Sequence, residues 1–149
     1  MHRTQAANLD LVSSDPQLNR YDEAWPIRAY HPDCPAARFL SLNDDHRGTV
    51  WQSIVGPGSV VLGGRVERSI VGRQCCIDGG AQVEDSILFD QVNIGRDVKL
   101  SRVVVEKGVT LRSGVSIGFD PALDQARGFT RSDGGVTVVP REAAAGLPP

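Results

Sequence analysis

The chain has 149 residues, 40% of them hydrophobic, and a formal net charge of −2. This length suits one domain with its own core, and the near-neutral charge gives no electrostatic basis for binding nucleic acid or an anionic membrane. The first residues lack an apolar signal segment, so we expect a cytoplasmic protein. Its three cysteines have no CxxC or paired-histidine spacing, so neither a disulfide framework nor a metal site is expected.

The first 52 residues are expected to lead into the main fold. Residues 4–15 favour a helix that ends before Pro16, since the residue before a proline avoids the helical region. Residues 1–18 are therefore assigned to the end of a helix and a linker. Residues 19–52 hold three prolines before position 36 and the rings of Tyr21, Trp25 and Tyr30, which predict an ordered crossing arm. Short strands are expected at residues 38–40 and 49–51.

From Ser69 to Ile117 the sequence repeats every 17 residues, in steps of six, six and five. The repeated branched aliphatics are Val71, Ile77, Val83, Leu88, Ile94, Leu100, Val105, Leu111 and Ile117. Two residues before each lies a small or aliphatic residue: Ser69, Cys75, Ala81, Ser86, Val92, Val98, Val103, Val109 and Val115. A period of six fits neither a helix nor a hairpin sheet, so the chain must turn a corner after each short strand. The pattern predicts an all-β parallel β-helix of triangular section, with about four coils over residues 53–118.

The register of the first coil is ambiguous. Ile54, Val60 and Val66 keep the 17-residue period, whereas residues 53–56 match residues 69–72 at a spacing of 16. We favour a shortened corner there. Glycines are expected at corners, where positive φ is often needed, at positions 72, 95, 108, 114 and 118. Cys75 should be a buried structural thiol, and Cys76 should point outward.

The period stops after Ile117. Asp120 followed by Pro121 indicates a helix N-cap with proline at the first helical position, and a short helical turn is expected through Arg127. Residues 136–139 are predicted to form a strand that covers an edge of the prism. Residues 119–141 are thus a closing turn and strand, and residues 142–149 are expected to be a disordered tail.

Many six-residue β-helices are acyltransferases that use a histidine from the coils as general base. The histidines of this chain, at positions 2, 31 and 46, all precede the predicted coils. This absence disfavours a stand-alone acyltransferase, and it also removes the carbonic anhydrase type, which needs three histidines on one zinc ion.

The flanking segments carry a more specific resemblance. Residues 19–28 read N-R-Y-D-E-A-W-P-I-R, which resembles the N-x-Y-D-x-x-W-P-I-R crossing into the C-terminal domain of bacterial ADP-glucose pyrophosphorylase, also called glucose-1-phosphate adenylyltransferase. Residues 7–13 are similar to the end of that family's last catalytic-domain helix, and residues 117–142 to its closing stretch. The resemblance covers residues 6–142 and implies that the β-helix is left-handed.

The resemblance also implies a function. The chain looks like the regulatory and oligomerisation domain of an enzyme that makes ADP-glucose and pyrophosphate from glucose 1-phosphate and ATP, with Mg²⁺, for glycogen biosynthesis. The family's Gly-rich phosphate loop and its Pro-Lys-Pro glucose-phosphate motif do not occur in these 149 residues. We therefore expect no catalytic residue, no cofactor and no adenylyl transfer in this chain alone. The alternatives are a stand-alone acyltransferase and a purely structural β-helix.

Candidate effector residues follow from the same resemblance. Lys107, in V-V-E-K-G, and Arg141, in V-P-R-E, occupy the positions of basic effector ligands. A lysine in place of the family's common arginine weakens bidentate phosphate binding. Arg131 and Arg28 are the next candidates, although each of the four is otherwise an ordinary surface charge. The expected partners are a weakly bound sugar-phosphate effector, the family's catalytic domain or an equivalent, and further copies of the chain.

Overall fold

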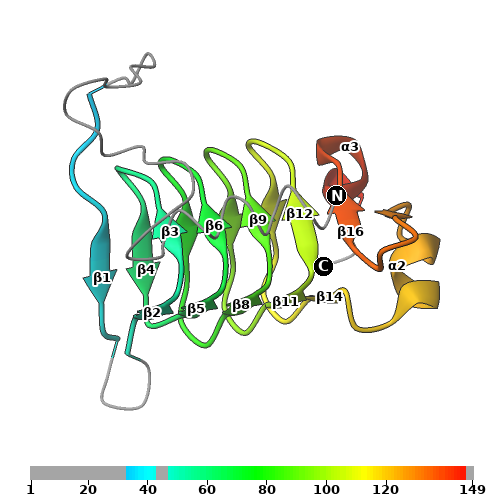
Figure 1. The fold of residues 1–149 in the computed structure, drawn as a ribbon, viewed down its shortest axis with the longest axis horizontal. Coiled ribbons are helices and arrows are strands. Elements are labelled where there is room, and N and C mark those ends of the chain that lie inside the picture. Colours follow the sequence, from blue (N-terminus) through cyan, green and yellow to red (C-terminus); the bar gives the residue numbers. More distant parts are fainter. Residues whose placement is uncertain (1–32, 43–46, 147–149) are drawn as a thin grey trace, which may run out of the picture.

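The computed structural model describes residues 33–42 and 47–146, which form a triangular prism of short strands (Figure 1). The expected helix at 4–15 and the first part of the crossing arm lie outside the described residues. No helix within the described residues is long and apolar enough to cross a membrane.

Each of the three faces is one sheet, to which every turn of the chain adds one strand. Face A contains β1 (Arg38–Leu40), β4 (Val60–Leu62), β7 (Cys76–Ile77), β10 (Asn93–Ile94) and β13 (Thr110–Leu111). Face B contains β2 (Thr49–Trp51), β5 (Arg65–Glu67), β8 (Gln82–Glu84), β11 (Lys99–Ser101) and β14 (Ser116–Ile117). Face C contains β3 (Ile54–Val55), β6 (Ile70–Val71), β9 (Ile87–Leu88), β12 (Val103–Val105), β16 (Thr137–Val139) and β15 (Thr130–Arg131). This is the predicted left-handed β-helix of about four turns.

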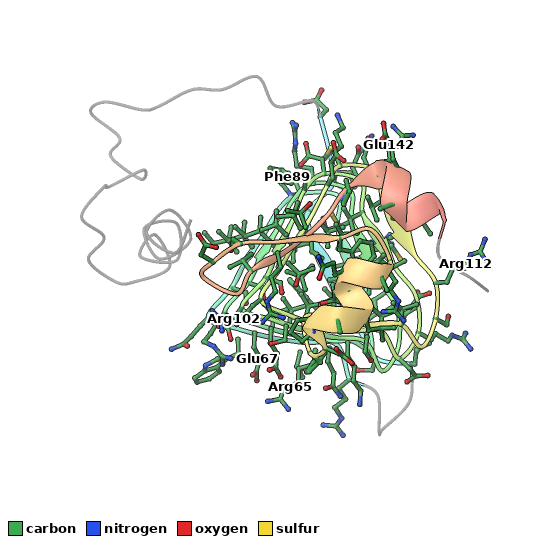
Figure 2. The ribbon with its side chains drawn as sticks, turned by 90° about the vertical axis from the view of Figure 1, so that its right-hand side faces the viewer. Arg65, Glu67, Phe89, Arg102, Arg112 and Glu142 are labelled. Atoms are coloured by element: carbon green, nitrogen blue, oxygen red, sulfur yellow. The ribbon has the colours of Figure 1, made fainter. Side chains whose placement is uncertain are left out.

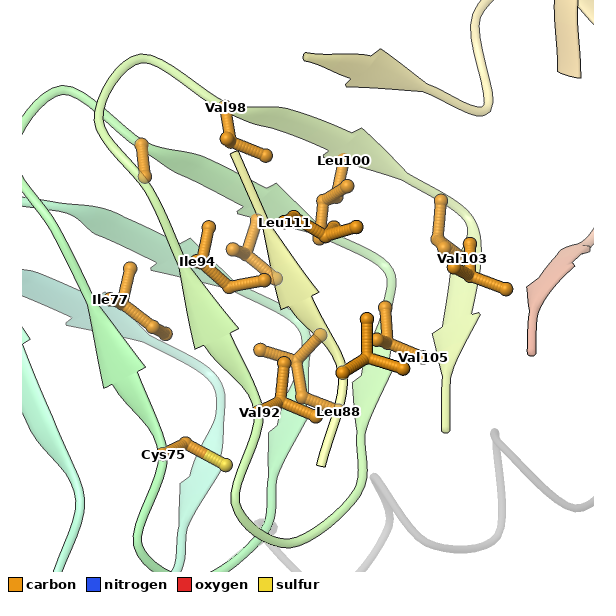
Figure 3. Packing of buried hydrophobic residues seen from close by; sticks show 14 of the residues in the cluster. Cys75, Ile77, Leu88, Val92, Ile94, Val98, Leu100, Val103, Val105 and Leu111 are labelled. Atoms are coloured by element: carbon orange, nitrogen blue, oxygen red, sulfur yellow. The ribbon is translucent and has the colours of Figure 1, made fainter. Parts of the chain in front are cut away.

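The core confirms the repeat. On face A, Ile77 pairs with Ile94 and Ile94 with Leu111, so each inward residue stacks on its equivalent 17 positions away. All nine branched aliphatics of the repeat are at most 1% exposed, and Cys75 is buried beside them (Figure 3). Each such side chain contributes about 1.5–3 kcal/mol of transfer free energy. The stacked aliphatic rows therefore hold the prism together.

The shortened corner lies between β4 and β5. Ile54 pairs with Ile70 at a spacing of 16, whereas Val66 pairs with Val83 at a spacing of 17. The register also places Val61 inward, opposite Ile77, where the 17-residue period favoured its neighbour at position 60. One residue has thus been lost from the first full turn without disturbing the stack.

Corner glycines serve two different purposes. Gly108, Gly114 and Gly118 have the expected positive φ. Gly72 and Gly95 do not, and a Cβ at either position would lie 2.7 Å or 2.8 Å from the backbone of the next coil. Close approach of neighbouring turns, rather than a left-handed conformation, therefore requires glycine at those two sites.

The prism begins earlier than the sequence analysis placed it. Strands β1 and β2 form as expected, but they pair in parallel with β4 and β5 and so belong to the first turn rather than to a separate arm. The tail also differs from the expected disorder, since Arg141–Ala145 form helix α3. Between these ends, α2 (Pro121–Ala126) has the expected N-cap at Asp120, whose carboxylate accepts from the backbone N–H of Ala122 and Leu123.

Candidate functional site

Lys107 lies at the corner where the chain turns from face C to face A. After β12 the chain passes through Glu106, Lys107 and Gly108, whose φ of +72° allows the turn. The backbone N–H of Gly108 donates to the carbonyl of Asp90, 3.0 Å away, one turn below. Lys107 is therefore the last of a column of corner residues, one per turn: Pro57, Arg73, Asp90 and Lys107.

Arg141 reaches the same corner from a distant part of the sequence. Strand β16 lies parallel to β12, with Val139 paired to Val105, and the chain then enters α3. The backbone N–H of Arg141 donates to the Glu106 carboxylate over 2.8 Å. A Cβ on Gly108 would lie 3.9 Å from Cζ of Arg141, so the guanidinium lies over the turn that carries Lys107. The structure thus brings these two predicted residues together.

The charges at this corner leave the two cations accessible. Asp90 is held by Arg73, with Nη2 2.6 Å from Oδ2, and hydrogen bonds from Arg73 together with the charge of Lys107 lower the pKa of that carboxyl. Within residues 33–42 and 47–146, neither Lys107 nor Arg141 forms a side-chain ion pair, and both are exposed. Two cationic side chains at one corner, where the carboxylates of Asp90 and Glu106 accept hydrogen bonds from Arg73 and from the backbone of Arg141, suit an anion with several acceptor oxygens, such as a phosphate ester.

The other two candidates do not join this corner. Arg131 lies on β15 at the opposite side of face C, beside Arg102 at the corner between faces B and C. Figure 2, a view along the prism axis, shows Arg102 and the α3 residue Glu142 on different sides of the cross-section. Arg28 lies outside the described residues.

No three histidine, cysteine, aspartate or glutamate side chains within the described part of the chain come together as a metal site. The buried carboxylate of Asp124 accepts from the backbone N–H of Gly118 and from the hydroxyl of Thr137, which accounts for its burial. Burial also raises the pKa of the Cys75 thiol, so this group is a poor nucleophile at neutral pH.

Sequence reasoning missed Glu106, which fixes Arg141 to the corner through the backbone hydrogen bond. No local pattern marks this residue, because its partner lies 35 positions away and meets it only through the pairing of β12 with β16.

Comparison with known proteins gives the relatives of this fold. The family described as "GlmU-like, C-terminal hexapeptide" matches residues 35–139. The chain is 47% identical over 138 residues to a glucose-1-phosphate adenylyltransferase of Rhodopirellula baltica, covering 91% of this chain and 31% of the relative. Proteins of the same name from Geobacter metallireducens and Deinococcus radiodurans are 40% and 38% identical, over 89% and 91% of this chain. The chain spans about a third of the length of these relatives.

Proposed function

Because the chain belongs to the GlmU-like C-terminal hexapeptide family, we propose that it is the regulatory and oligomerisation domain of an ADP-glucose pyrophosphorylase. The names of its relatives support the enzyme, and the resemblance at residues 19–28 supports the position of the domain. The observation that carries the regulatory role is that Lys107 and Arg141 lie at one corner of the prism. The two residues are far apart in the sequence, so the fold rather than the local sequence brings them together.

The proposed ligand is a phosphorylated sugar that acts as an effector. Its phosphate oxygens would accept from the ammonium of Lys107 and the guanidinium of Arg141. Charge-assisted hydrogen bonds contribute about 1.5–3 kcal/mol each, and exposure to solvent reduces this. Two such contacts give a dissociation constant in the millimolar range at best, about 4 kcal/mol. In the proposal, the remaining cationic ligands belong to the rest of the full-length enzyme.

The proposed reaction of that full-length enzyme is the adenylylation of glucose 1-phosphate by ATP, with Mg²⁺, in cytoplasmic glycogen biosynthesis. The sequence of this chain contains no Gly-rich phosphate loop to hold ATP. The purified 149-residue chain should therefore release no pyrophosphate from ATP and glucose 1-phosphate. Turnover in a coupled pyrophosphate assay would contradict this part of the proposal.

We also propose that the chain forms oligomers and packs against a catalytic domain. Within the described residues, Phe39, Leu40, Leu42 and Trp51 lie exposed around the first turn. Large exposed apolar side chains gathered in one region favour association. Light scattering should show a dimer or a larger assembly, and a monomeric mass at high protein concentration would count against it.

The effector role is tested by NMR titration of the chain with fructose 1,6-bisphosphate at low salt. Amide resonances near Lys107 and Arg141 should shift together and saturate at millimolar ligand, and Lys107→Ala should abolish the shifts. Arg112→Ala is the matched control, because it removes another exposed cation, which follows β13 at the next corner of the same turn. Shifts that survive Lys107→Ala, or no shifts at tens of millimolar ligand, would leave both residues as surface charges.

A further inference from the structure

A row of aliphatic side chains lies on the outer surface of face C, whose strands β3, β6, β9, β12 and β16 lie side by side along the prism (Figure 1). In each of these strands, the residue before the inward aliphatic points away from the core, because successive side chains of a strand alternate. These outward residues are partly buried and pair with one another from turn to turn. They are Ile54, Ile70, Ile87, Val104 and Val138.

Among the described strands, faces A and B carry no such row. On face A the outward row ends in Asn93 and Thr110, and on face B it contains Arg65, Gln82 and Lys99. Branched aliphatics favour strands on any face, so strand formation alone does not explain why face C is aliphatic in every turn. A continuous apolar row on an outer surface is instead typical of a contact with another protein surface.

Charged residues line both edges of this row in the same order of signs. Along the prism, each edge carries a positive, then a negative, then a positive residue. At the corner between faces B and C these residues are Arg68, Asp85 and Arg102. At the corner between faces C and A they are Arg73, Asp90 and Lys107.

We propose that face C is the contact between two copies of this chain, which lie antiparallel so that Ile70 of one copy faces Ile87 of the other. A two-fold axis parallel to the strands, passing between β6 and β9, relates the copies. The two sheets are then aligned and pack about 10 Å apart, as in a β-sandwich. This inference rests on the proposed oligomerisation and names the face that carries it.

The charges at the two edges select the antiparallel arrangement. If the two prisms lay parallel, the two kinds of corner would face each other within the same turn. Arg68 would then lie opposite Arg73, and Asp85 would lie opposite Asp90. In the antiparallel arrangement Arg68 lies opposite Asp85 of the second copy, and Arg73 lies opposite Asp90 of the second copy. Complementary charges of this kind fix the orientation of a complex more than its affinity.

The size of the contact predicts a weak dimer. The overlapping strands are β3, β6, β9 and β12 of each copy, which at about 4.8 Å per strand span roughly 15–20 Å. A stable interface buries about 800 Å² on each partner, and a face of this length lies at the small end of that range. The dimer should therefore form and dissociate with concentration.

The test is sedimentation equilibrium of the whole 149-residue chain over a range of concentrations, which measures the dissociation constant of the dimer. Ile87→Glu should raise that constant at least tenfold, because it places a carboxylate against Ile70 of the second copy. The matched control is Gln82→Glu, which adds the same charge at an exposed position of face B and should leave the constant unchanged. If Ile87→Glu does not fold, Ile87→Thr keeps a β-branched side chain and should still raise the constant.

The orientation is tested by reversing one edge. Arg68→Glu should raise the dissociation constant several-fold, because it places two carboxylates opposite each other. The double variant Arg68→Glu with Asp85→Arg should return the constant to the parent value. In the parallel arrangement the double variant would instead place unlike charges opposite Arg73 and Asp90. A double variant that associates more tightly than the parent would therefore overturn the antiparallel arrangement.

Leu40→Glu separates this inference from the proposed oligomerisation, since Leu40 belongs to the exposed apolar residues of the first turn. If Leu40→Glu dissociates the assembly and Ile87→Glu does not, the oligomerisation stands and the contact through face C is overturned. A parent chain that is monomeric at every concentration would overturn both. A large loss of thermal stability in Ile87→Glu with no change in mass would show that another segment of the same chain covers face C, which also overturns the proposal.

Discussion

The two ends of the prism belong to the same row of inward residues, but only the C-terminal end of that row is covered by further elements. On face A this row runs from Phe39 in β1 to Leu111 in β13. Phe39 is 49% exposed, whereas Leu111 is 1% exposed. Beyond β13, the residues Phe129, Val139 and Ala144 belong to the same buried cluster as the coils, and α3 packs on β13. Within the described residues, no comparable element lies beyond β1 (Figure 1).

The two ends show that the repeat does not provide the residues that cover its own first and last turns. Each turn buries its inward residues against the turns on either side, so the first and last turns need sequence of another kind to cover them. At the C-terminal end, residues 119–145 supply that cover through α2, β15, β16 and α3. The apolar residues of the first turn are the counterpart that the described chain leaves exposed.

The largest loss of stability is expected in the middle of the prism, where each inward residue has a neighbouring turn on both sides. Ile94 is 1% exposed and stacks between Ile77 and Leu111. Ile94→Asp would bury a carboxylate without a partner, a change expected to cost more than about 4 kcal/mol and to unfold the domain. Circular dichroism checks the loss of β structure.

The control is Asn93→Asp, which introduces the same carboxylate on the same strand but on its exposed side. That variant should melt like the parent chain. Unchanged melting of Ile94→Asp would show that the register of β10 is wrong.

The next prediction compares the two ends directly. Leu111→Ala should destabilise the domain by about 2–5 kcal/mol, the usual cost for a fully buried leucine. Phe39→Ala removes a larger side chain but should cost only about 1–2 kcal/mol, because half of that side chain is already exposed. Urea unfolding of both variants measures the difference. Equal costs would show that another part of the chain, or a second copy, covers the first turn in solution.

The coils could be predicted from the sequence because stacked residues must be alike, which leaves a regular 17-residue signal at positions such as Ile77, Ile94 and Leu111. The first turn breaks that signal. Arg38 pairs with Val60, so more residues separate β1 from β4 than separate the later strands, and the period does not extend to it. Helix α3 was missed because a five-residue helix has little signal of its own and depends on packing against β13.

The residues of the candidate site could be predicted from the sequence, but their proximity could not, because it depends on the path of β16. Lys107 and Arg141 were identified from family motifs, but their meeting depends on β16 crossing face C beside β12. Arg131 pairs with Thr137 at the start of that strand, whereas Arg141 follows its end. Arg131 and Arg141, which are ten positions apart in the sequence, therefore lie at two different corners of the prism.

A smaller effect is expected from the polar support of the C-terminal cover. Asp124 is 2% exposed, and its carboxylate accepts from the backbone N–H of Gly118 at 2.8 Å and from the hydroxyl of Thr137 at 3.3 Å. Asp124→Ala leaves both donors without a partner, at a cost of about 1–3 kcal/mol. Thermal unfolding measures the loss. Asp133→Ala, at an exposed position, is the control and should stay within about 0.5 kcal/mol of the parent chain. A cost for Asp124→Ala no larger than that of the control would show that the cover does not depend on this carboxylate.

The smallest loss of stability is expected at Asp90, in the column of corner residues that also contains Arg73 and Lys107, and this loss depends on pH. Hydrogen bonds from Arg73 hold the pKa of Asp90 below its usual value of 3.8, so the folded state binds a proton less readily there than the unfolded chain does. The stabilisation is therefore complete above pH 3.8 and is lost as the pH falls through the lower, folded pKa.

Asp90→Asn should cost under about 1 kcal/mol at pH 7, as for other partly exposed ion pairs. Urea unfolding of both proteins should show this difference at pH 7 and a progressively smaller one as the pH falls from 3.8, where the unfolded chain takes up the proton, through the lower pKa of the folded parent. A difference that stays constant down to acid pH would assign the cost to a changed fit of the side chain at position 90, which accepts from the backbone N–H of Arg73, rather than to charge.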